Sequence, residues 1–160
     1  KINFKISENQ DFIEYSPLGF KYLNDILKIL ERNNGGLLII DYGYLSEKMK
    51  DTLQAIHKQK YSLVLENVGK SDITYHVSFN LIKKIIQNYQ KLSSVFTSQK
   101  KFFTNLGIKQ RAEIISKNKT FTEKADIFYR INRLINDKEM GDLFKVMFIT
   151  NLKNKFKLGF

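Results

Sequence analysis

The apolar residues of the chain change their spacing several times, and each change predicts a different element. Over residues 1–7 apolar and polar side chains alternate, which predicts a half-exposed strand. Ser16 and Pro17 then predict a helix start, because serine accepts free backbone N–H groups and proline suits the first helical position. Helical spacing continues to Asn34–Gly36, where we expect a glycine to end the helix in a left-handed cap.

The short apolar run Leu37–Asp41 is the most informative segment. It is apolar until its last residue, and Tyr42 and Gly43 follow directly. Such a run is typical of a strand that is buried on both faces of a parallel sheet. Ligands of open α/β sheets bind at the carboxyl ends of these strands. The run therefore predicts an interior strand that carries Asp41, Tyr42 and Gly43 to a functional edge.

Helical and strand patterns alternate through the rest of the chain. We predict a weak helix over residues 47–58 and a polar loop over residues 66–71. The other predicted elements are a helix capped by Ser78, a strand at Ser94–Thr97, a helix between Ser98 and Gly107, a helix at Ile108–Ser116, a helix opened by the Thr120–Glu123 capping box, a strand at Leu143–Thr150 and a frayed tail at Lys153–Phe160. This alternation predicts the α/β fold class in a single domain.

The composition narrows the chemistry. The 160 residues amount to one domain or part of one. The absence of cysteine excludes disulfides and cysteine-ligated metals, and with only two histidines we expect no metal site. Membrane-spanning helices need about 20 consecutive apolar residues, and no run approaches that length. Because the chain starts with lysine, we expect it to be a fragment or a processed product.

The formal net charge of +11 allows a nucleic-acid-binding domain as an alternative function. Lysine far outnumbers arginine, however, and the positive charge is spread along the whole chain. That distribution is typical of a solvated surface, so we do not expect a nucleic-acid partner.

Common catalytic signatures are missing: we find no GxGxxG, GxxxxGK[ST], HExxH or GxSxG pattern. Polar residues instead gather near the Asp41 strand end and again in the segment 69–77. Asp41 can orient a cationic substrate or simply cap a turn, and Asp72 with Thr74 can serve a site or form an Asx turn. His76 can carry a proton or pack as an ordinary side chain, and His57 is expected to be a surface residue.

Six segments in register resemble the C-terminal half of the MidA-type family of S-adenosylmethionine-dependent methyltransferases. This family includes a mitochondrial arginine methyltransferase of respiratory complex I assembly. The matching segments are Glu14–Pro17, Gly36–Gly43, Asp51–Ala55, Asp72–Phe79, Leu106–Ala112 and Met140–Val146. The resemblance implies a partial Rossmann-like fold with helical insertions, in which Leu37–Asp41 is the fifth strand. Ser94–Thr97 and Leu143–Thr150 would then form the terminal antiparallel pair.

The resemblance also implies that S-adenosylmethionine is the cofactor of the complete protein. The family's glycine-rich loop and acidic cofactor residue would lie upstream of Lys1, so we expect no cofactor-binding residue here and no activity from this chain alone. The strand that should flank Leu37–Asp41 would be absent as well. Its absence would leave an unpaired edge for the missing half, an oligomer or a partner chain to cover.

The site follows from the resemblance and from the chemistry of arginine. A guanidinium nucleophile is best oriented by a carboxylate that binds it bidentately. Asp41 or Asp72 would supply this carboxylate and Tyr42 would line the channel. The expected catalytic residues are Asp41, Tyr42, Asp72 and His76, and the expected substrate-binding residues are Gly43, Thr52, Gln54 and Thr74.

The implied substrate is a protein arginine, with a respiratory complex I subunit as the candidate partner. The implied compartment is the bacterial cytoplasm or the mitochondrial matrix. Two positions depart from the family pattern: Ser78 stands where an aspartate is usual, and Gln59 stands where a histidine is frequent. A non-catalytic remnant or binding module is therefore the alternative reading.

Overall fold

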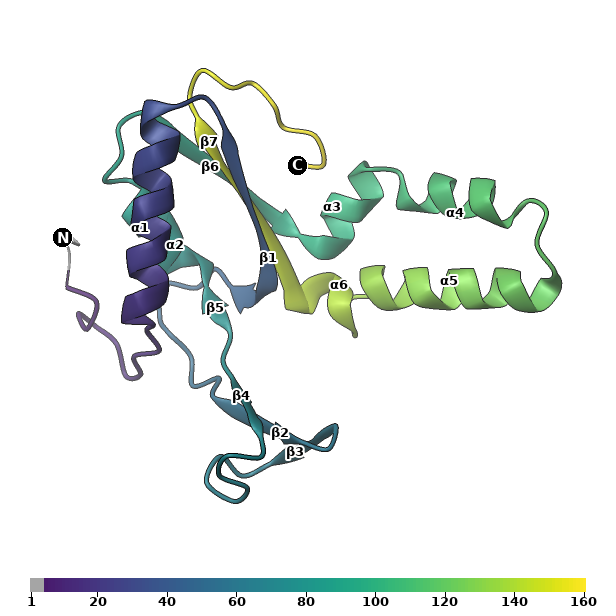
Figure 1. Ribbon diagram of the computed structural model, residues 1–160, viewed down its shortest axis with the longest axis horizontal. Helices are drawn as coiled ribbons and strands as arrows, with labels where there is room; N and C mark the ends of the chain where they lie inside the picture. The colour runs from purple at the N-terminus through teal and green to yellow at the C-terminus, as the bar shows by residue number, and fades with distance from the viewer. Residues whose placement is uncertain (1–4) are drawn as a thin grey trace.

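The computed structural model describes residues 5–160 and shows an α/β fold with a main sheet, a small sheet and a helical arm (Figure 1). The main sheet has four strands in the order β5-β1-β7-β6, and the small sheet has three in the order β3-β2-β4. The elements are α1 (Pro17–Arg32), β1 (Gly36–Tyr44), β2 (Gln54–His57), β3 (Lys60–Ser62), β4 (Asp72–Thr74), β5 (Val77–Ser78), α2 (Phe79–Ile86), β6 (Leu92–Ser98), α3 (Gln99–Asn105), α4 (Ile108–Ser116), α5 (Phe121–Ile135), α6 (Met140–Leu143) and β7 (Phe144–Asn151).

Three strands of the main sheet pair along their full length. β7 lies antiparallel to β1 on one side and antiparallel to β6 on the other. The predicted antiparallel pair at the end of the chain is therefore confirmed. The other edge of β1 pairs with β5 only at Gly43 and Tyr44. Along Gly36–Tyr42 this edge has no strand partner within residues 5–160.

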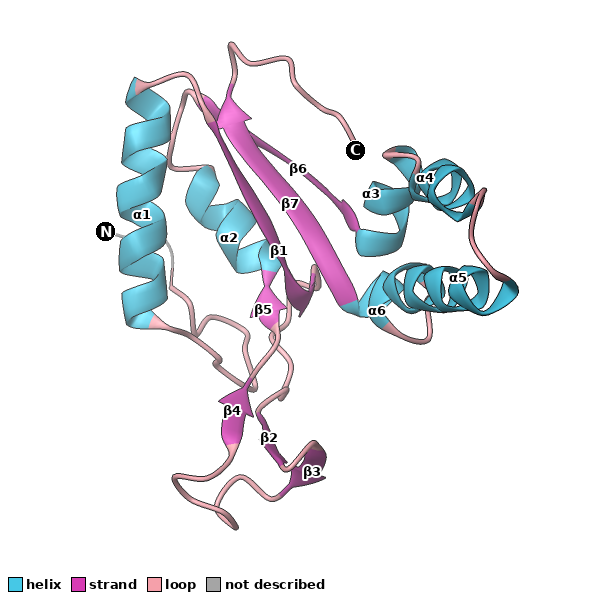
Figure 2. Ribbon diagram, turned by 45° about the vertical axis from the view of Figure 1, so that its right-hand side comes forward, coloured by secondary structure: helices cyan, strands magenta, loops and turns pink. Residues whose placement is uncertain are grey.

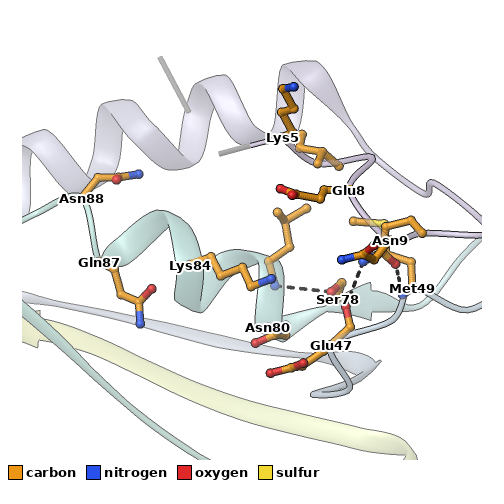
Figure 3. A pocket seen from close by; sticks show the side chains of 13 residues that line it. Lys5, Glu8, Asn9, Glu47, Met49, Ser78, Asn80, Lys84, Gln87 and Asn88 are labelled. Carbon is orange, nitrogen blue, oxygen red and sulfur yellow. Dashed lines mark hydrogen bonds between the residues drawn. The ribbon is translucent and has the colours of Figure 1, made fainter. Parts of the chain in front are cut away.

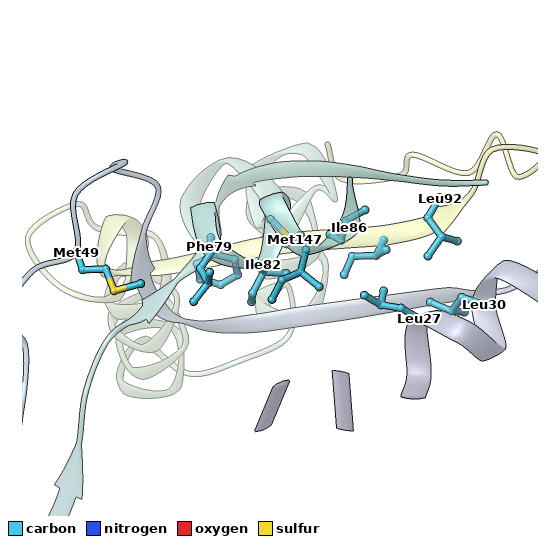
Figure 4. Close-up of a cluster of buried hydrophobic side chains, with 11 residues drawn as sticks. Leu27, Leu30, Met49, Phe79, Ile82, Ile86, Leu92 and Met147 are labelled. Carbon is cyan, nitrogen blue, oxygen red and sulfur yellow. The ribbon is translucent and has the colours of Figure 1, made fainter. Parts of the chain in front are cut away.

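The hydrophobic core lies between one face of the main sheet and the helices α1 and α2 (Figures 2 and 4). Leu27 of α1, Phe79 and Ile85 of α2, and Met147 and Ile149 of β7 are almost completely buried there. Because side chains alternate along a strand, Leu37 and Ile39 of β1 also face this core. This layer fixes the position of the strand that carries the predicted site.

The second face of β1 is open, so the prediction of burial on both faces is wrong for this chain. Leu38 and Ile40 are 46% and 42% exposed. Helix α1 carries a further apolar stripe away from the core, where Leu18, Tyr22 and Ile29 are 57%, 60% and 59% exposed. The apolar run does form a strand, but residues 5–160 pack against only one of its two faces.

Several helix starts agree with the sequence, because each has a side-chain cap. Ser16 accepts a hydrogen bond from the backbone N–H of Gly19, and Ser78 accepts one from Leu81. Thr120 and Glu123 form the predicted reciprocal capping box at the start of α5. Helices α4 and α5 then run side by side as an arm that projects from the main sheet (Figure 1).

The predicted helix over residues 47–58 is wrong. The structure has an extended loop there, followed by the β2–β3 hairpin. Lys58 and Gln59 both have left-handed backbone angles, with φ of 48° and 63°, which suit a two-residue hairpin turn. The turn at Lys58 and Gln59 therefore determines the local structure, and the weak helical spacing of the preceding residues does not.

Two predictions about chain ends also need correction. The end of α1 uses no left-handed glycine: Asn33 is extended, and its N–H donates to the carbonyl of Ile29. Residues 1–4 of the predicted first strand lie outside the described residues, and residues 5–9 form a turn-rich loop without a strand.

The C-terminal tail is packed on the protein instead of frayed. Phe160 lies 5.2 Å from the ring of Phe102 and 6.2 Å from that of Phe148, measured between ring centroids. Asn105 also donates its side-chain amide to the carbonyl of Gly159. Contacts between aromatic rings hold the tail in place. The basic composition of the tail, on which its prediction as frayed depended, did not indicate these contacts.

Candidate functional site

A hollow of about 540 Å³ lies between the small sheet and the C-terminal end of β1. Its lining comes from both sheets and from the short helix α6. The lining residues are Tyr42, Gln54, Ile56, Tyr61, Asp72, Thr74, His76, Leu143 and Phe144. Five of the eight predicted site residues meet here, namely Tyr42, Gln54, Asp72, Thr74 and His76.

One face of the small sheet forms the first wall. Ile56 of β2 pairs with Tyr61 of β3 on one side and with Asp72 of β4 on the other, and the next pair on the same face is Gln54 with Thr74. Cross-strand partners share a face, so all five side chains point the same way. The side-chain amide of Gln54 donates to the hydroxyl of Thr74 at 3.1 Å. That bond leaves the amide oxygen of Gln54 available as an acceptor.

Aromatic rings form the second wall. The Tyr42 ring meets Phe144 edge to face, with ring centroids 5.3 Å apart, and Phe144 is its partner across the β1–β7 ladder. The His76 ring also contacts Tyr42, with ring centroids 5.6 Å apart. Tyr42 thus packs against two rings, and these contacts help to define its position near the strand end.

The charge of the hollow is opposite to that of the chain. Among residues 5–160, Asp72 is the one carboxylate in the lining, and neither a lysine nor an arginine lines it. This contrast is informative because the whole chain carries a formal net charge of +11. A carboxylate beside three aromatic rings and uncharged acceptors suits a cationic ligand.

Asp41 and Gly43 are close to the hollow but do not line it. The Asp41 carboxylate accepts a hydrogen bond from the backbone N–H of Tyr42 at 2.8 Å. Gly43 is packed so tightly that an added Cβ would lie 2.2 Å from the Val77 carbonyl oxygen. Gly43 therefore allows the close approach of β1 and β5, and its backbone does not use the left-handed region.

Thr52 does not line the hollow. Its hydrogen bonds identify a residue that sequence reasoning missed, Glu14. Its backbone N–H and its hydroxyl both donate to the Glu14 carboxylate, at 2.8 and 2.5 Å. Its hydroxyl oxygen also accepts the backbone N–H of His76 at 2.9 Å. Glu14 belongs to a segment that matches the family pattern, and this was the available signal in the sequence.

The two departures from the family pattern occupy structural positions. Ser78 is the N-cap of α2, a role that serine and aspartate fill equally well. Gln59 is exposed in the turn of the β2–β3 hairpin and does not line the hollow. Neither substitution changes the lining of the site.

Two other hollows carry less specific chemistry. One of about 350 Å³ lies between the N-terminal segment and α2, and Lys5, Glu8, Glu47 and Lys84 are among the residues that line it (Figure 3). Another of about 360 Å³ is bordered by residues 12–15 together with Asp51, Leu53 and Tyr75. In the described part of the chain no cluster of histidines and carboxylates is suited to a metal ion. Within the same residues no helix is both long and apolar enough to cross a membrane.

Comparison with known proteins decides the family. Residues 1–97 match the family described as "Putative S-adenosyl-L-methionine-dependent methyltransferase". The chain belongs to this methyltransferase family. The cofactor of this family is S-adenosylmethionine, as the resemblance of the six segments implied.

Relatives of this methyltransferase chain include two curated frog proteins, each named "Protein arginine methyltransferase NDUFAF7, mitochondrial". The *Xenopus tropicalis* protein is 28% identical over 139 residues, which cover 86% of this chain and 32% of the relative. The *Xenopus laevis* protein is 27% identical over 154 residues, covering 94% and 35%. The chain thus spans about a third of the length of these relatives.

Two solved structures from *Burkholderia thailandensis* share the fold. The native crystal structure of an uncharacterized protein aligns with a TM-score of 0.67 and 25% identity, covering 86% of this chain and 38% of that one. The second aligns with a TM-score of 0.63 and 26% identity, covering 80% and 35%, and was solved with S-adenosyl-homocysteine bound. The α/β architecture of this chain is therefore shared with these two solved structures.

Proposed function

We propose that this chain is the substrate side of a protein arginine methyltransferase and that the hollow beside Tyr42 receives the arginine side chain. The observation that carries the proposal is the lining: within the described part of the chain it consists of one carboxylate, uncharged acceptors and aromatic rings, without a competing lysine or arginine. The names of the frog relatives, which specify protein arginine methylation, support the same substrate class.

Each part of the lining has a role in binding a guanidinium. Asp72 accepts N–H groups and fixes the plane of the cation, which a bidentate carboxylate does well. The free oxygen of Gln54 and the hydroxyl of Thr74 accept further N–H groups from the small sheet. Tyr42 and Phe144 shield the planar faces and exclude water from the reacting nitrogen.

The chemical step needs alignment and a proton acceptor. When bound, S-adenosylmethionine supplies an electrophilic methyl group, and the site must hold the arginine nitrogen in line with it. The nitrogen would form a bond to the methyl carbon as the bond between that carbon and the cofactor sulfur breaks, with S-adenosyl-homocysteine as the leaving group, and the nitrogen would lose a proton. We propose that His76 accepts this proton, because its side chain lines the hollow and contacts Tyr42.

The cofactor would be held by a segment outside this chain. Within the 160 residues no glycine-rich loop follows a strand, so we derive no cofactor contact from them. The edge of β1 along Gly36–Tyr42, which pairs with no other strand of residues 5–160, and the exposed Leu38 and Ile40 beside it fit a further strand and layer. We propose that the cofactor-binding part of a longer protein completes the sheet there, as the length of the relatives supports.

The names of the relatives and the family resemblance together predict a biological substrate and a compartment. The relatives are named mitochondrial, and a complex I subunit is the substrate that the family resemblance suggests. For this chain, the mitochondrial matrix and the bacterial cytoplasm are both consistent with the proposal.

Methyl transfer to defined peptides tests the proposed function. The full-length protein is incubated with S-adenosylmethionine carrying a labelled methyl group and with paired peptides that contain either arginine or lysine. We expect label only in the arginine peptides, and a loss of about 10²-fold or more for Asp72→Asn, since misorientation of a nucleophile has this effect. Equal labelling of lysine peptides, or full activity of Asp72→Asn, would contradict the assignment.

A further inference from the structure

We infer that Glu14 is a positioning residue that holds the small sheet against the main sheet and so sets the width of the hollow. The inference about its effect on turnover rests on the proposed function. Its structural part, the anchoring of the small sheet, stands on the hydrogen bonds alone.

Glu14 binds one residue through both carboxylate oxygens. One oxygen accepts the backbone N–H of Thr52 at 2.8 Å, and the other accepts the Thr52 hydroxyl at 2.5 Å. The Thr52 oxygen accepts the backbone N–H of His76 at 2.9 Å. Hydrogen bonds to a charged carboxylate are stronger than neutral ones, so this three-residue clamp is a firm connection.

The clamp lies where the small sheet joins the rest of the protein. Thr52 precedes the first residue of β2 by two positions, and His76 follows the last residue of β4 by two positions. The chain therefore enters and leaves the small sheet through clamped residues. Glu14 comes from the segment before α1, and α1 packs on the main sheet. The carboxylate thus ties both connections to the body of the protein.

The strands of the small sheet contact mainly one another, and the segment that enters the sheet is also held where the backbone N–H groups of Met49 and Lys50 donate to Gln10 and Tyr44. In Figures 1 and 2 the small sheet stands apart from the main sheet and reaches it through these two connections. Side chains on both of its faces are open to solvent: Tyr61 of β3 is 78% exposed and Ile73 of β4 is 50% exposed. A change in the clamp would therefore move one entire wall of the hollow, including Asp72 and Gln54, relative to Tyr42.

Spin labels across the hollow measure this directly in the full-length protein. Residues 1–160 contain no cysteine, so Gln59→Cys and Lys138→Cys provide one label on the hairpin tip and one near α6, after replacement of any cysteine elsewhere. We expect a narrow distance distribution for the parent and for Thr52→Ser, which keeps the hydroxyl. The distribution should broaden in Glu14→Gln and in Thr52→Val.

Asp51→Asn is the matched control, because Asp51 is the exposed neighbour of Thr52. It should leave the distance distribution unchanged.

Glu14→Gln and Thr52→Val should also lower kcat/KM by about 10-fold to 100-fold, because small displacements of a reacting group have effects of this size. Thr52→Ser, which keeps the hydroxyl, should keep kcat/KM at the parent value. Unchanged distances in both Glu14→Gln and Thr52→Val would overturn the inference. Broadened distances in a protein that methylates no arginine would instead count against the proposed function alone.

Discussion

Asp41 and Tyr42 are adjacent at the end of β1 but lie on opposite faces of the main sheet. Tyr42 packs against Phe144 and lines the hollow, whereas Asp41 shares the face of Leu37 and Ile39. The Asp41 carboxylate accepts the N–H of Tyr42 and so fixes the strand end. Of the two aspartates that the sequence offered for guanidinium binding, Asp72 is the one that lines the hollow.

We therefore predict different effects for the two aspartates. Asp72→Asn should reduce arginine methylation by about 10²-fold, and Asp41→Asn should reduce it by about 10-fold or less, through a displaced Tyr42. Initial rates with one arginine peptide, measured for both variants of the full-length protein, make the comparison. A larger loss for Asp41→Asn than for Asp72→Asn would move the orienting role to Asp41.

Replacement of Gly43 should destabilise the fold. A Cβ at this position would overlap the Val77 carbonyl oxygen and lie 2.8 Å from the Phe79 ring. We expect Gly43→Ala to lower the free energy of unfolding by about 1–3 kcal/mol, as overpacking does. Urea titration provides the value. Gly35→Ala, where the nearest atom would be at 3.4 Å, is the control and should have little effect.

The start of α5 should become less stable in acid. The backbone N–H of Thr120, the Lys119 ammonium and the Thr120 hydroxyl bind Glu123 and lower its pKa from the usual 4.5 to about 2. A lowered folded-state pKa adds stability above the unfolded value, and the addition disappears as the pH falls from about 4.5 to about 2.

Unfolding measured across this range should show the effect as a difference between variants. The parent should be more stable than Glu123→Gln above pH 5, and the two should converge toward pH 2. Glu113→Gln on the neighbouring helix α4 serves as the control. A difference between parent and Glu123→Gln that stays constant with pH would show that the capping carboxylate contributes no such stability.

The C-terminal tail should contribute to stability. Phe160 packs on Phe102 and Phe148, so Phe160→Ala should lower the free energy of unfolding by about 1–2 kcal/mol. Thermal unfolding of the variant gives the result. Phe121→Ala is the matched control, since Phe121 is 87% exposed. An unchanged melting temperature for Phe160→Ala would mean that the tail is not held by these rings.

The elements with strong local signals were predictable from the sequence. Ser16, Ser78 and the Thr120–Glu123 box each start a helix because a side chain satisfies free N–H groups. The strand at Leu37–Asp41 also agrees with its prediction, and these signals depend on neighbours within a few residues, so a single sequence contains them. The antiparallel pair β6–β7 agrees with what the family resemblance implied.

The small sheet was not predictable in the same way. Its strands are three or four residues long and depend on pairing between Gln54–His57 and Asp72–Thr74, which are distant in sequence. The resemblance nevertheless selected Gln54, Asp72 and Thr74, and the structure brings them to one hollow. Glu14 escaped notice because its partner, Thr52, is 38 positions away. Contacts of this range become visible only in the folded chain.

The most direct test of the account is calorimetric titration of S-adenosyl-homocysteine into two proteins, residues 1–160 alone and the full-length protein. If the chain is the substrate side of a larger methyltransferase, the full-length protein should bind the ligand and residues 1–160 should give no binding heat. Tight binding by residues 1–160 alone would contradict the proposal that the cofactor site lies beyond them.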